Sequence, residues 1–275
     1  MIINFIKMHG LGNDFVIIDN NKEQLQLTTD NIKLLCNRNF GIGCDQLILT
    51  EDIEPRKLIK ISIFNANGSK ASACGNATRC VALYAMKKYR INSIKIKTDN
   101  RILTTHFSNN NNIMVNMGKS SFNAIDIPLE NTTLNPLKLS FPELQLKEYG
   151  VAVNVGNPHV VFIVNDFNHI NLAELGPKIE NHHFFPEKVN VEFIKVVDKN
   201  TIVMKVWERG TGITTACGTG ATATFAVAKL LNLINNDNVK IILDGGELLL
   251  HINKDNQIIL EGPATLVFEG KFYLH

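Results

Sequence analysis

The most constraining feature of this sequence is an internal repeat. Ala-Cys-Gly occurs around Cys74 and again, 143 positions later, around Cys217. In both places a strand-like apolar segment precedes the cysteine and a helix-like apolar segment follows it. The match continues upstream, where residues 12–17 correspond to residues 156–161 at an offset of 144. We therefore expect the chain to fold into two similar halves.

The length of the chain suits two domains. Its 275 residues can bury two cores of ordinary size. Residues 119–143 contain several prolines and asparagines, which mark the crossing between the halves. Residues 258–274 alternate in polarity like a strand that returns to the first domain. We predict an N-terminal domain of residues 1–118 plus 263–275 and a C-terminal domain of residues 119–262.

The helix predicted after each cysteine is apolar on almost every side, as residues 223–228 illustrate. A helix of this kind is buried all round. We therefore predict an α/β (α+β) fold of two pseudo-symmetric domains, each a curved, mostly antiparallel sheet wrapped around a central buried helix. A separate helix is expected to start after an N-cap at residues 28–30 and to end near Arg38.

Composition narrows the class of protein. The formal net charge is +2 without any basic block, which argues against nucleic acid as a partner. No apolar stretch approaches the ~20 residues that cross a bilayer, and the N-terminus does not have the sections of a signal peptide. The five cysteines lack disulfide-framework spacing, which suits a reducing compartment. A cytoplasmic protein without a membrane partner is expected.

The two repeated cysteines are candidate acid/base groups. A thiol at a helix N-terminus is near unpaired N–H groups, which can lower its pKa from ~8.5 to between roughly 3.5 and 7.5. The alternative is a small buried cysteine with a structural role. If the halves face each other, Cys74 and Cys217 approach one cleft from opposite sides. Inversion at a carbon requires one group to remove a proton and another to return it on the far face.

Amide side chains recur at turns and strand ends of both halves. Such groups bond amino and carboxylate groups without adding charge. Taken singly they are ordinary turn residues, but several occupy matched places in the repeats, which favours ligand binding. They are Asn13, Gln46, Asn65, Asn157 and Asn190.

The repeats differ where an unsymmetrical ligand would bind. Glu208 and Arg209 replace Asn65 and Ala66 of the first copy, offering a carboxylate and a guanidinium for an ammonium and a carboxylate. His159 replaces a phenylalanine and could polarise one thiol while Glu208 acts on the other. A single histidine on an apolar strand is more often structural.

No cofactor or metal is expected. A pyridoxal phosphate site would need a Schiff-base lysine with a phosphate cradle, and no such pattern is present. The adjacent histidines His182 and His183 have no third ligand at a recognisable spacing. We infer catalysis by side chains alone.

With these residues in view, the chain resembles the diaminopimelate epimerase family almost end to end. The combination of motifs is specific, although no single motif is. The matching segments are residues 9–15, 41–46, 74–76, 156–159, 189–191, 208–210, 216–220 and 261–264.

The resemblance implies interconversion of LL- and meso-2,6-diaminoheptanedioate, for lysine and peptidoglycan precursor synthesis, in the cleft between the two domains of a homodimer. By that likeness Cys217 accepts and Cys74 donates the proton in the LL to meso direction. The reacting centre would be held by Asn13, Gln46, Gly75, Asn76, Gly218 and Thr219. The distal centre would be held by Asn65, Asn157, Asn190, Glu208 and Arg209.

Four residues depart from the family pattern: Asn67, Ala77, Ile213 and Phe268. Phe268 belongs to the C-terminal segment through which the family pairs, so it bears on the dimer. The alternatives are a racemase of the same fold acting on another amino acid, a cysteine-nucleophile acyl transferase, and a non-catalytic binding module.

Overall fold

The computed structural model describes residues 1–21, 25–71, 75–108, 112–234 and 238–274. The chain divides into two compact units. The first unit comprises the described residues of 1–115 and 261–275, and the second comprises those of 116–260. None of the described helices combines the length and the apolar character needed to span a bilayer.

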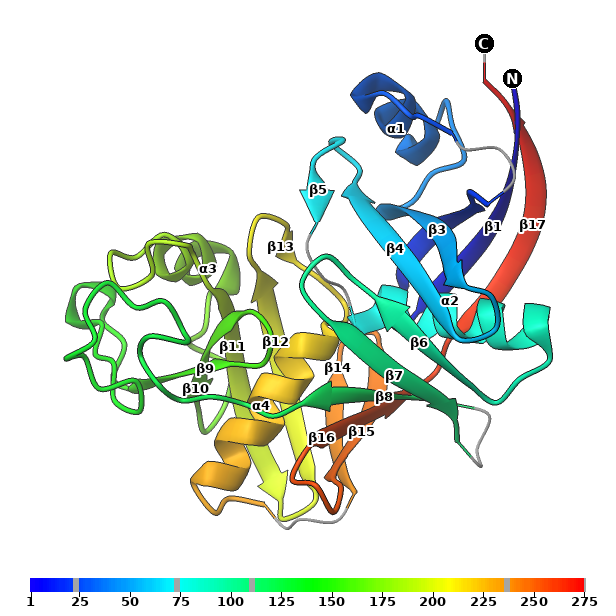
Figure 1. Ribbon diagram of the computed structural model, residues 1–275. Coiled ribbons are helices and arrows are strands. Elements are labelled where there is room, and N and C mark those ends of the chain that lie inside the picture. The colour runs from blue at the N-terminus through cyan, green and yellow to red at the C-terminus, as the bar shows by residue number, and fades with distance from the viewer. Residues whose placement is uncertain (22–24, 72–74, 109–111, 235–237, 275) are drawn as a thin grey trace. The chain divides into compact units, whose positions relative to one another are not determined.

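The first unit is a mixed sheet with two helices (Figure 1). Strand β1 pairs antiparallel with β2, β2 parallel with β3, β3 antiparallel with β4, β4 parallel with β6, and β6 antiparallel with β7. The elements are β1 (Ile2–Gly10), β2 (Asn13–Asp19), α1 (Thr29–Cys36), β3 (Gln46–Glu54), β4 (Leu58–Asn65), β5 (Lys70–Ala71), α2 (Gly75–Tyr89), β6 (Ser93–Lys97), β7 (Ile102–Phe107), β8 (Ile113–Gly118) and β17 (Thr265–Tyr273).

The second unit repeats this order of elements and pairings. Strand β9 pairs antiparallel with β10, β10 parallel with β11, β11 antiparallel with β12, β12 parallel with β14, and β14 antiparallel with β15. The elements are the 3-10 helix η1 (Pro142–Leu144), β9 (Gly150–Asn154), β10 (Pro158–Ile163), α3 (Leu172–Glu180), β11 (Asn190–Asp198), β12 (Thr201–Glu208), β13 (Gly212–Ile213), α4 (Gly218–Leu230), β14 (Val239–Leu243), β15 (Gly246–Ile252) and β16 (Ile258–Gly262). The predicted repeat is therefore confirmed at the level of strand topology.

Helix α4 is the buried centre of the second unit. Every residue from Gly218 to Ala228 is buried, and the helix contacts strands β9 to β12, β14 and β15. Helix α2 is buried in the same way over most of its length, in contact with β1, β2, β6 and β7. The prediction of one central helix per domain is confirmed. Because the helices are enclosed, the residues at their N-termini are fixed by packing on several sides.

Helix α1 begins where the sequence predicted. Thr28 is its N-cap and forms a capping box with Asn31, in which each side chain bonds the other residue's backbone N–H. The buried face of the helix consists of Ile32, Leu35 and Cys36, so Cys36 packs in the core.

The C-terminal segment returns to the first unit, as its alternating pattern indicated. Strand β17 pairs antiparallel with β1 over nearly its whole length, so the two chain ends lie side by side (Figure 1). The amino group of Met1 donates to the Leu274 carbonyl at 2.6 Å. Four large hydrophobic side chains of β17, those of Leu266, Val267, Phe268 and Tyr273, stay exposed.

Candidate active site

Cys217 is the N-cap of α4. Its Sγ accepts a hydrogen bond from the Gly220 N–H at 3.3 Å and lies 3.4 Å from Thr219 Oγ1. The side chain is buried, with 3% of the residue exposed. The expected placement of this cysteine at a helix N-terminus is confirmed, and it gives the sulfur two polar contacts within its own first turn.

The expected direction of the Cys217 pKa is wrong. Burial raises the pKa of this thiol well above its usual value, and the nearby carboxylates of Glu208 and Glu192 raise it further. The hydrogen bonds from Thr219 and Gly220 act in the opposite direction but are outweighed. Cys217 is therefore a neutral thiol in the resting protein, and it needs a base to become a nucleophile or a proton acceptor.

Glu208 lies beside that thiol. Burial raises the pKa of the Glu208 carboxyl, while hydrogen bonds from Thr214 and Cys217 lower it to a smaller extent. Thr214 Oγ1 donates to Glu208 Oε1 at 2.5 Å. A carboxyl with a raised pKa is a better base than an exposed one, so Glu208 can take the proton of Cys217.

His159 is completely buried on β10. Its Nδ1 lies 2.7 Å from Oε1 of Glu192, which is also completely buried, and its Nε2 lies 3.1 Å from Asn157 Oδ1. Asn157 Nδ2 in turn donates to Thr219 Oγ1 at 3.5 Å. A polar chain thus runs from Glu192 to the residue that contacts the Cys217 sulfur.

Asn190 and Arg209 are held by the backbone around them. Asn190 Nδ2 donates to the Pro158 carbonyl and its Oδ1 accepts the Arg209 N–H, both at 2.9 Å. The Arg209 guanidinium donates to the Glu187 carbonyl at 2.8 Å. Asn190 therefore ties β10 to the turn that carries Arg209.

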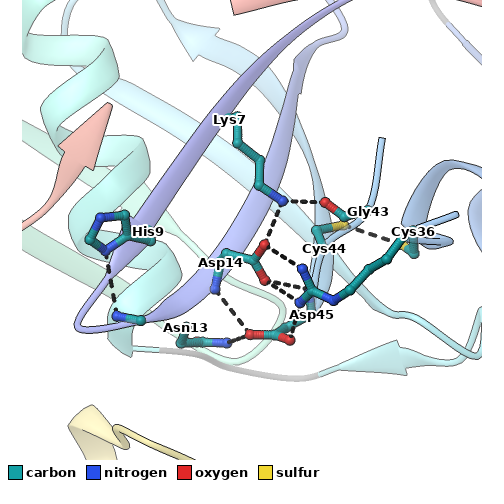
Figure 2. A network of polar contacts seen from close by, with 10 residues as sticks. Lys7, His9, Asn13, Asp14, Cys36, Gly43, Cys44 and Asp45 are labelled. Atoms are coloured by element: carbon teal, nitrogen blue, oxygen red, sulfur yellow. Dashed lines mark hydrogen bonds and ion pairs between the residues drawn. The ribbon is translucent and has the colours of Figure 1, made fainter. Parts of the chain in front are cut away.

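In the first unit, Asn13 is hydrogen-bonded to a charged network formed by Asp14, Arg38 and Asp45 (Figure 2). Asn13 Nδ2 donates to Asp45 Oδ2 at 3.0 Å, and Asn13 Oδ1 accepts from Asn76 Nδ2 at 3.3 Å. Arg38 joins the two acids, with bonds of 3.0 and 2.8 Å to Asp14 and of 2.8 Å to Asp45. The network fixes the Asn13 amide beside the first turn of α2.

The same network contacts a thiol pair and a lysine (Figure 2). Lys7 forms an ion pair of 2.5 Å with Asp14 and donates to the Gly43 carbonyl. The Cys36 and Cys44 sulfur atoms lie 3.5 Å apart, and Cys44 directly follows Gly43 in the chain. Burial would raise the pKa of Asp14, but its bonds to Arg38 and Lys7 hold that pKa below the usual range.

Gln46 and Asn65 face each other across β3 and β4. Gln46 Nε2 donates to Asn65 Oδ1 at 2.9 Å, and Asn65 Nδ2 donates to Ser69 Oγ at 3.0 Å. Gln46 Oε1 is buried without a hydrogen-bond partner in the described part of the chain. An acceptor of this kind is suited to a ligand ammonium group.

Several supporting residues carry no clear signal in the sequence. Arg79 is fully buried in α2, where it donates to Asn76 Oδ1 at 2.9 Å and to the Pro263 carbonyl at 3.1 Å. Its position one turn after Asn76 is the only hint that the sequence contains. Arg38 and Asp45 are separated from each other by a turn, and both lie far from Asp14 in the sequence. Their contacts with Asp14 could therefore be found only from the structure.

Two predictions about Cys74 are not tested by the structure. Cys74 falls in the segment 72–74, outside the described residues; Gly75 and Asn76, which follow it, begin α2 and are buried. The meeting of Cys74 and Cys217 in one cleft stays a prediction. Within the described residues, no group of three or more potential ligands could hold a metal ion.

Comparison with solved structures defines the class of protein by its fold. A PhzF-family phenazine biosynthesis protein from Bacillus anthracis matches with a TM-score of 0.67 and 15% identity, covering 100% of both chains. A hydroxyproline epimerase from Agrobacterium vitis matches with a TM-score of 0.66 and 11% identity, covering 98% of this chain and 91% of that one. The chain therefore has the doubled α/β fold of these proteins.

Sequence comparison is more specific. The sequence profile described as "Diaminopimelate epimerase" matches residues 5–123 and 151–267. The diaminopimelate epimerase of Zymomonas mobilis subsp. mobilis is 41% identical over 271 residues, covering 98% of this chain and 97% of that protein. That of Carboxydothermus hydrogenoformans is 38% identical over 277 residues, covering 99% and 100%. The chain belongs to the diaminopimelate epimerase family.

Proposed function

We propose that this protein interconverts LL- and meso-2,6-diaminoheptanedioate by moving one α-proton, without a cofactor. The observation that carries the proposal is the Cys217 thiol at the N-terminus of α4 with the Glu208 carboxyl as its hydrogen-bond partner. Membership of the family, with relatives of that name at about 40% identity over nearly the full length, supports the same reaction.

The proposed chemistry begins with the neutral thiol. Glu208 takes the Cys217 proton, and the resulting thiolate removes the substrate α-proton in the LL to meso direction. Cys74 returns a proton on the opposite face, and the roles reverse in the other direction. Backbone N–H groups of the first turn of α4 stabilise negative charge that develops beside them.

The proposed substrate contacts divide by the two ends of the diacid. At the reacting centre, Gln46 Oε1 is an available acceptor for the α-ammonium. The other residues there are Asn13, Gly75, Asn76, Gly218 and Thr219. The distal centre is assigned to Asn65, Asn157, Asn190, Glu208 and Arg209. The Arg209 guanidinium pairs with the distal carboxylate.

Assembly and location complete the proposal. A homodimer would cover exposed apolar side chains of β17, among which Phe268 packs edge to face on Phe5 with ring centroids 5.8 Å apart. The protein would act in the cytoplasm, on a small-molecule substrate that serves lysine and peptidoglycan precursor synthesis.

The test is deuterium exchange. The reduced protein is incubated with LL-diaminoheptanedioate in D₂O, and deuterium at the α-carbon is followed together with formation of the meso isomer. The wild type should catalyse both, and Cys74→Ala and Cys217→Ala should each abolish the interconversion. No exchange by the wild type with this substrate, but exchange with proline or hydroxyproline, would assign the protein to a racemase of another amino acid.

A further inference from the structure

The pair formed by His159 and Glu192 is unusual for the interior of a sheet. Both side chains are completely buried, on adjacent parallel strands, with 2.7 Å between Nδ1 and Oε1. Glu192 Oε2 has no hydrogen-bond partner among the described residues. Burying an ionisable pair with an unsatisfied oxygen costs free energy, so packing alone does not account for it.

The first repeat shows what packing alone needs at this place. Phe15 stands at the position of His159, and Ile48 at that of Glu192, an offset of 144 in both cases. Both are completely buried on the equivalent parallel strands β2 and β3. The fold is therefore built with two apolar side chains in one unit and an acid and a base in the other.

Helix α4 makes room for the acid beside the reactive thiol. A Cβ on Gly220 would lie 2.8 Å from Glu192 Oε1 and 3.3 Å from Cys217 Sγ. In the first repeat the matching helical residue is Ala77, at an offset of 143, where the residue that matches Glu192 is apolar. The glycine therefore allows the carboxylate to approach the turn that carries Cys217.

Hydrogen-bond direction links Glu192 to that turn. Asn157 donates through Nδ2 to Thr219 Oγ1, so its Oδ1 faces His159 and must accept. His159 Nε2 therefore carries a hydrogen. One further proton lies between His159 Nδ1 and Glu192 Oε1, and it fixes the ring in the orientation that Asn157 requires.

We propose that Glu192 is a positioning residue for the reaction, which holds His159, and through it Asn157 and Thr219, in register with the Cys217 sulfur. This inference rests on the proposed function. Besides His159, the titratable groups with which Glu192 interacts electrostatically, among the described residues of this unit, are Cys217 and Glu208. Glu192 does not touch the substrate.

The test compares Glu192→Gln and Glu192→Ile with the wild type and with Glu247→Gln, which removes a surface carboxylate paired with Lys240 in the same unit. We expect kcat to fall about 10-fold in Glu192→Gln and about 100-fold in Glu192→Ile, with smaller changes in KM, because loss of register acts on the proton transfer. The melting temperatures of the two variants should not follow the order of their kcat values, because isoleucine is the residue that the first repeat has at this position. The control should keep wild-type kcat.

A double variant, His159→Phe with Glu192→Ile, separates positioning from packing. It recreates the pair of the first repeat and should melt no lower than the wild type. Unfolding of this variant, or kcat within about twofold of wild type in both single variants, would overturn the proposal.

One readout does not depend on the substrate. The ¹⁵N shifts of His159 report which ring nitrogens are protonated, and they should change in Glu192→Ile but not in Glu247→Gln. If the wild type fails to exchange the α-proton while these shifts still change, the proposed function fails and the positioning contact stands. Unchanged shifts in Glu192→Ile would reject the positioning contact itself.

Discussion

Thr214 and Glu208 are joined by a hydrogen bond of 2.5 Å between the threonine hydroxyl and carboxylate Oε1, across the turn that precedes Cys217. This bond lowers the pKa of Glu208, although burial raises that pKa by more. The hydroxyl therefore favours the ionised form of Glu208, which is the form that can accept a proton.

Thr214→Val should raise the Glu208 pKa further, because it removes a donor that favours the carboxylate. If ionised Glu208 is the base for Cys217, the acid limb of kcat/KM against pH moves to higher pH, and activity above that limb is largely kept. The pH profile of α-proton exchange measures this shift. Thr222→Val, which removes a hydroxyl that donates to the Gly218 carbonyl, is the matched control and should leave the limb in place.

Glu208→Gln separates the chemistry of the carboxyl from its effect on stability. A general base contributes roughly 10²- to 10⁴-fold, so kcat should fall by at least about 10²-fold.

The same variant tests the effect of Glu208 on stability. The folded-state pKa of Glu208 is raised, so its contribution to stability is fully present below the unfolded-state pKa and is lost as pH rises through the folded-state pKa. The variant should therefore lose less stability than the wild type over that rise in pH. Thermal melts from pH 4 upward measure this, and parallel curves would contradict it.

The parts of the fold visible in the sequence were those encoded by spacing and polarity. The offset between Cys74 and Cys217 predicted the repeat, the apolar helix after Cys217 predicted its burial, and the alternating C-terminal segment predicted β17. Each of these depends on a pattern within a few tens of residues or on direct comparison of two segments.

The electrostatics of the site could not be read from the sequence. The helix N-terminus at Cys217 predicted a lowered pKa, but the sign depends on how much protein covers the sulfur and on the carboxylates beside it. Glu192 reads as one polar residue in an apolar strand, and only the parallel register of β10 and β11 brings it to His159. The contact between Arg38 and Asp14 likewise depends on the fold and has no signal in the sequence.

Arg38→Gln should weaken substrate binding more than turnover. It removes the group that joins Asp14 to Asp45, and Asp45 holds Asn13 by a bond of 3.0 Å. We expect KM to rise about 5- to 10-fold, with a smaller change in kcat, because the proposed role of Asn13 is to bind the substrate and not to transfer the proton. Arg56→Gln is the control, since Arg56 donates to the Tyr89 carbonyl away from Asn13. A fall in kcat at unchanged KM would contradict this assignment.

Phe268→Glu should weaken the proposed dimer. The ring is 46% exposed on β17, and a carboxylate there would have to lose its hydration on burial between subunits. Sedimentation velocity over a range of protein concentrations should show a shift toward monomer. Ile102→Glu changes a side chain of similar exposure, 53%, on β7 and should leave the sedimentation unchanged. Wild-type sedimentation of Phe268→Glu would remove β17 from the interface.

Gly220→Ala should impair catalysis while sparing the fold. The added methyl group would lie 2.8 Å from Glu192 Oε1, so the carboxylate must shift away from His159 or the helix must move. Alanine is favoured over glycine in a helix by roughly 1 kcal/mol, which offsets part of the strain. We expect kcat to fall about 10-fold or more and the melting temperature to change by a few degrees.

Thr224→Val is the control. It is a buried change on the same helix, it removes a hydroxyl that contacts Met204, and it should keep kcat. Introducing the first repeat's pair, His159→Phe with Glu192→Ile, in the Gly220→Ala background should raise the melting temperature, since all three positions then carry the residues of the first repeat, Phe15, Ile48 and Ala77. A fall in melting temperature in that triple variant would show that the space beside Gly220 serves packing and not the carboxylate.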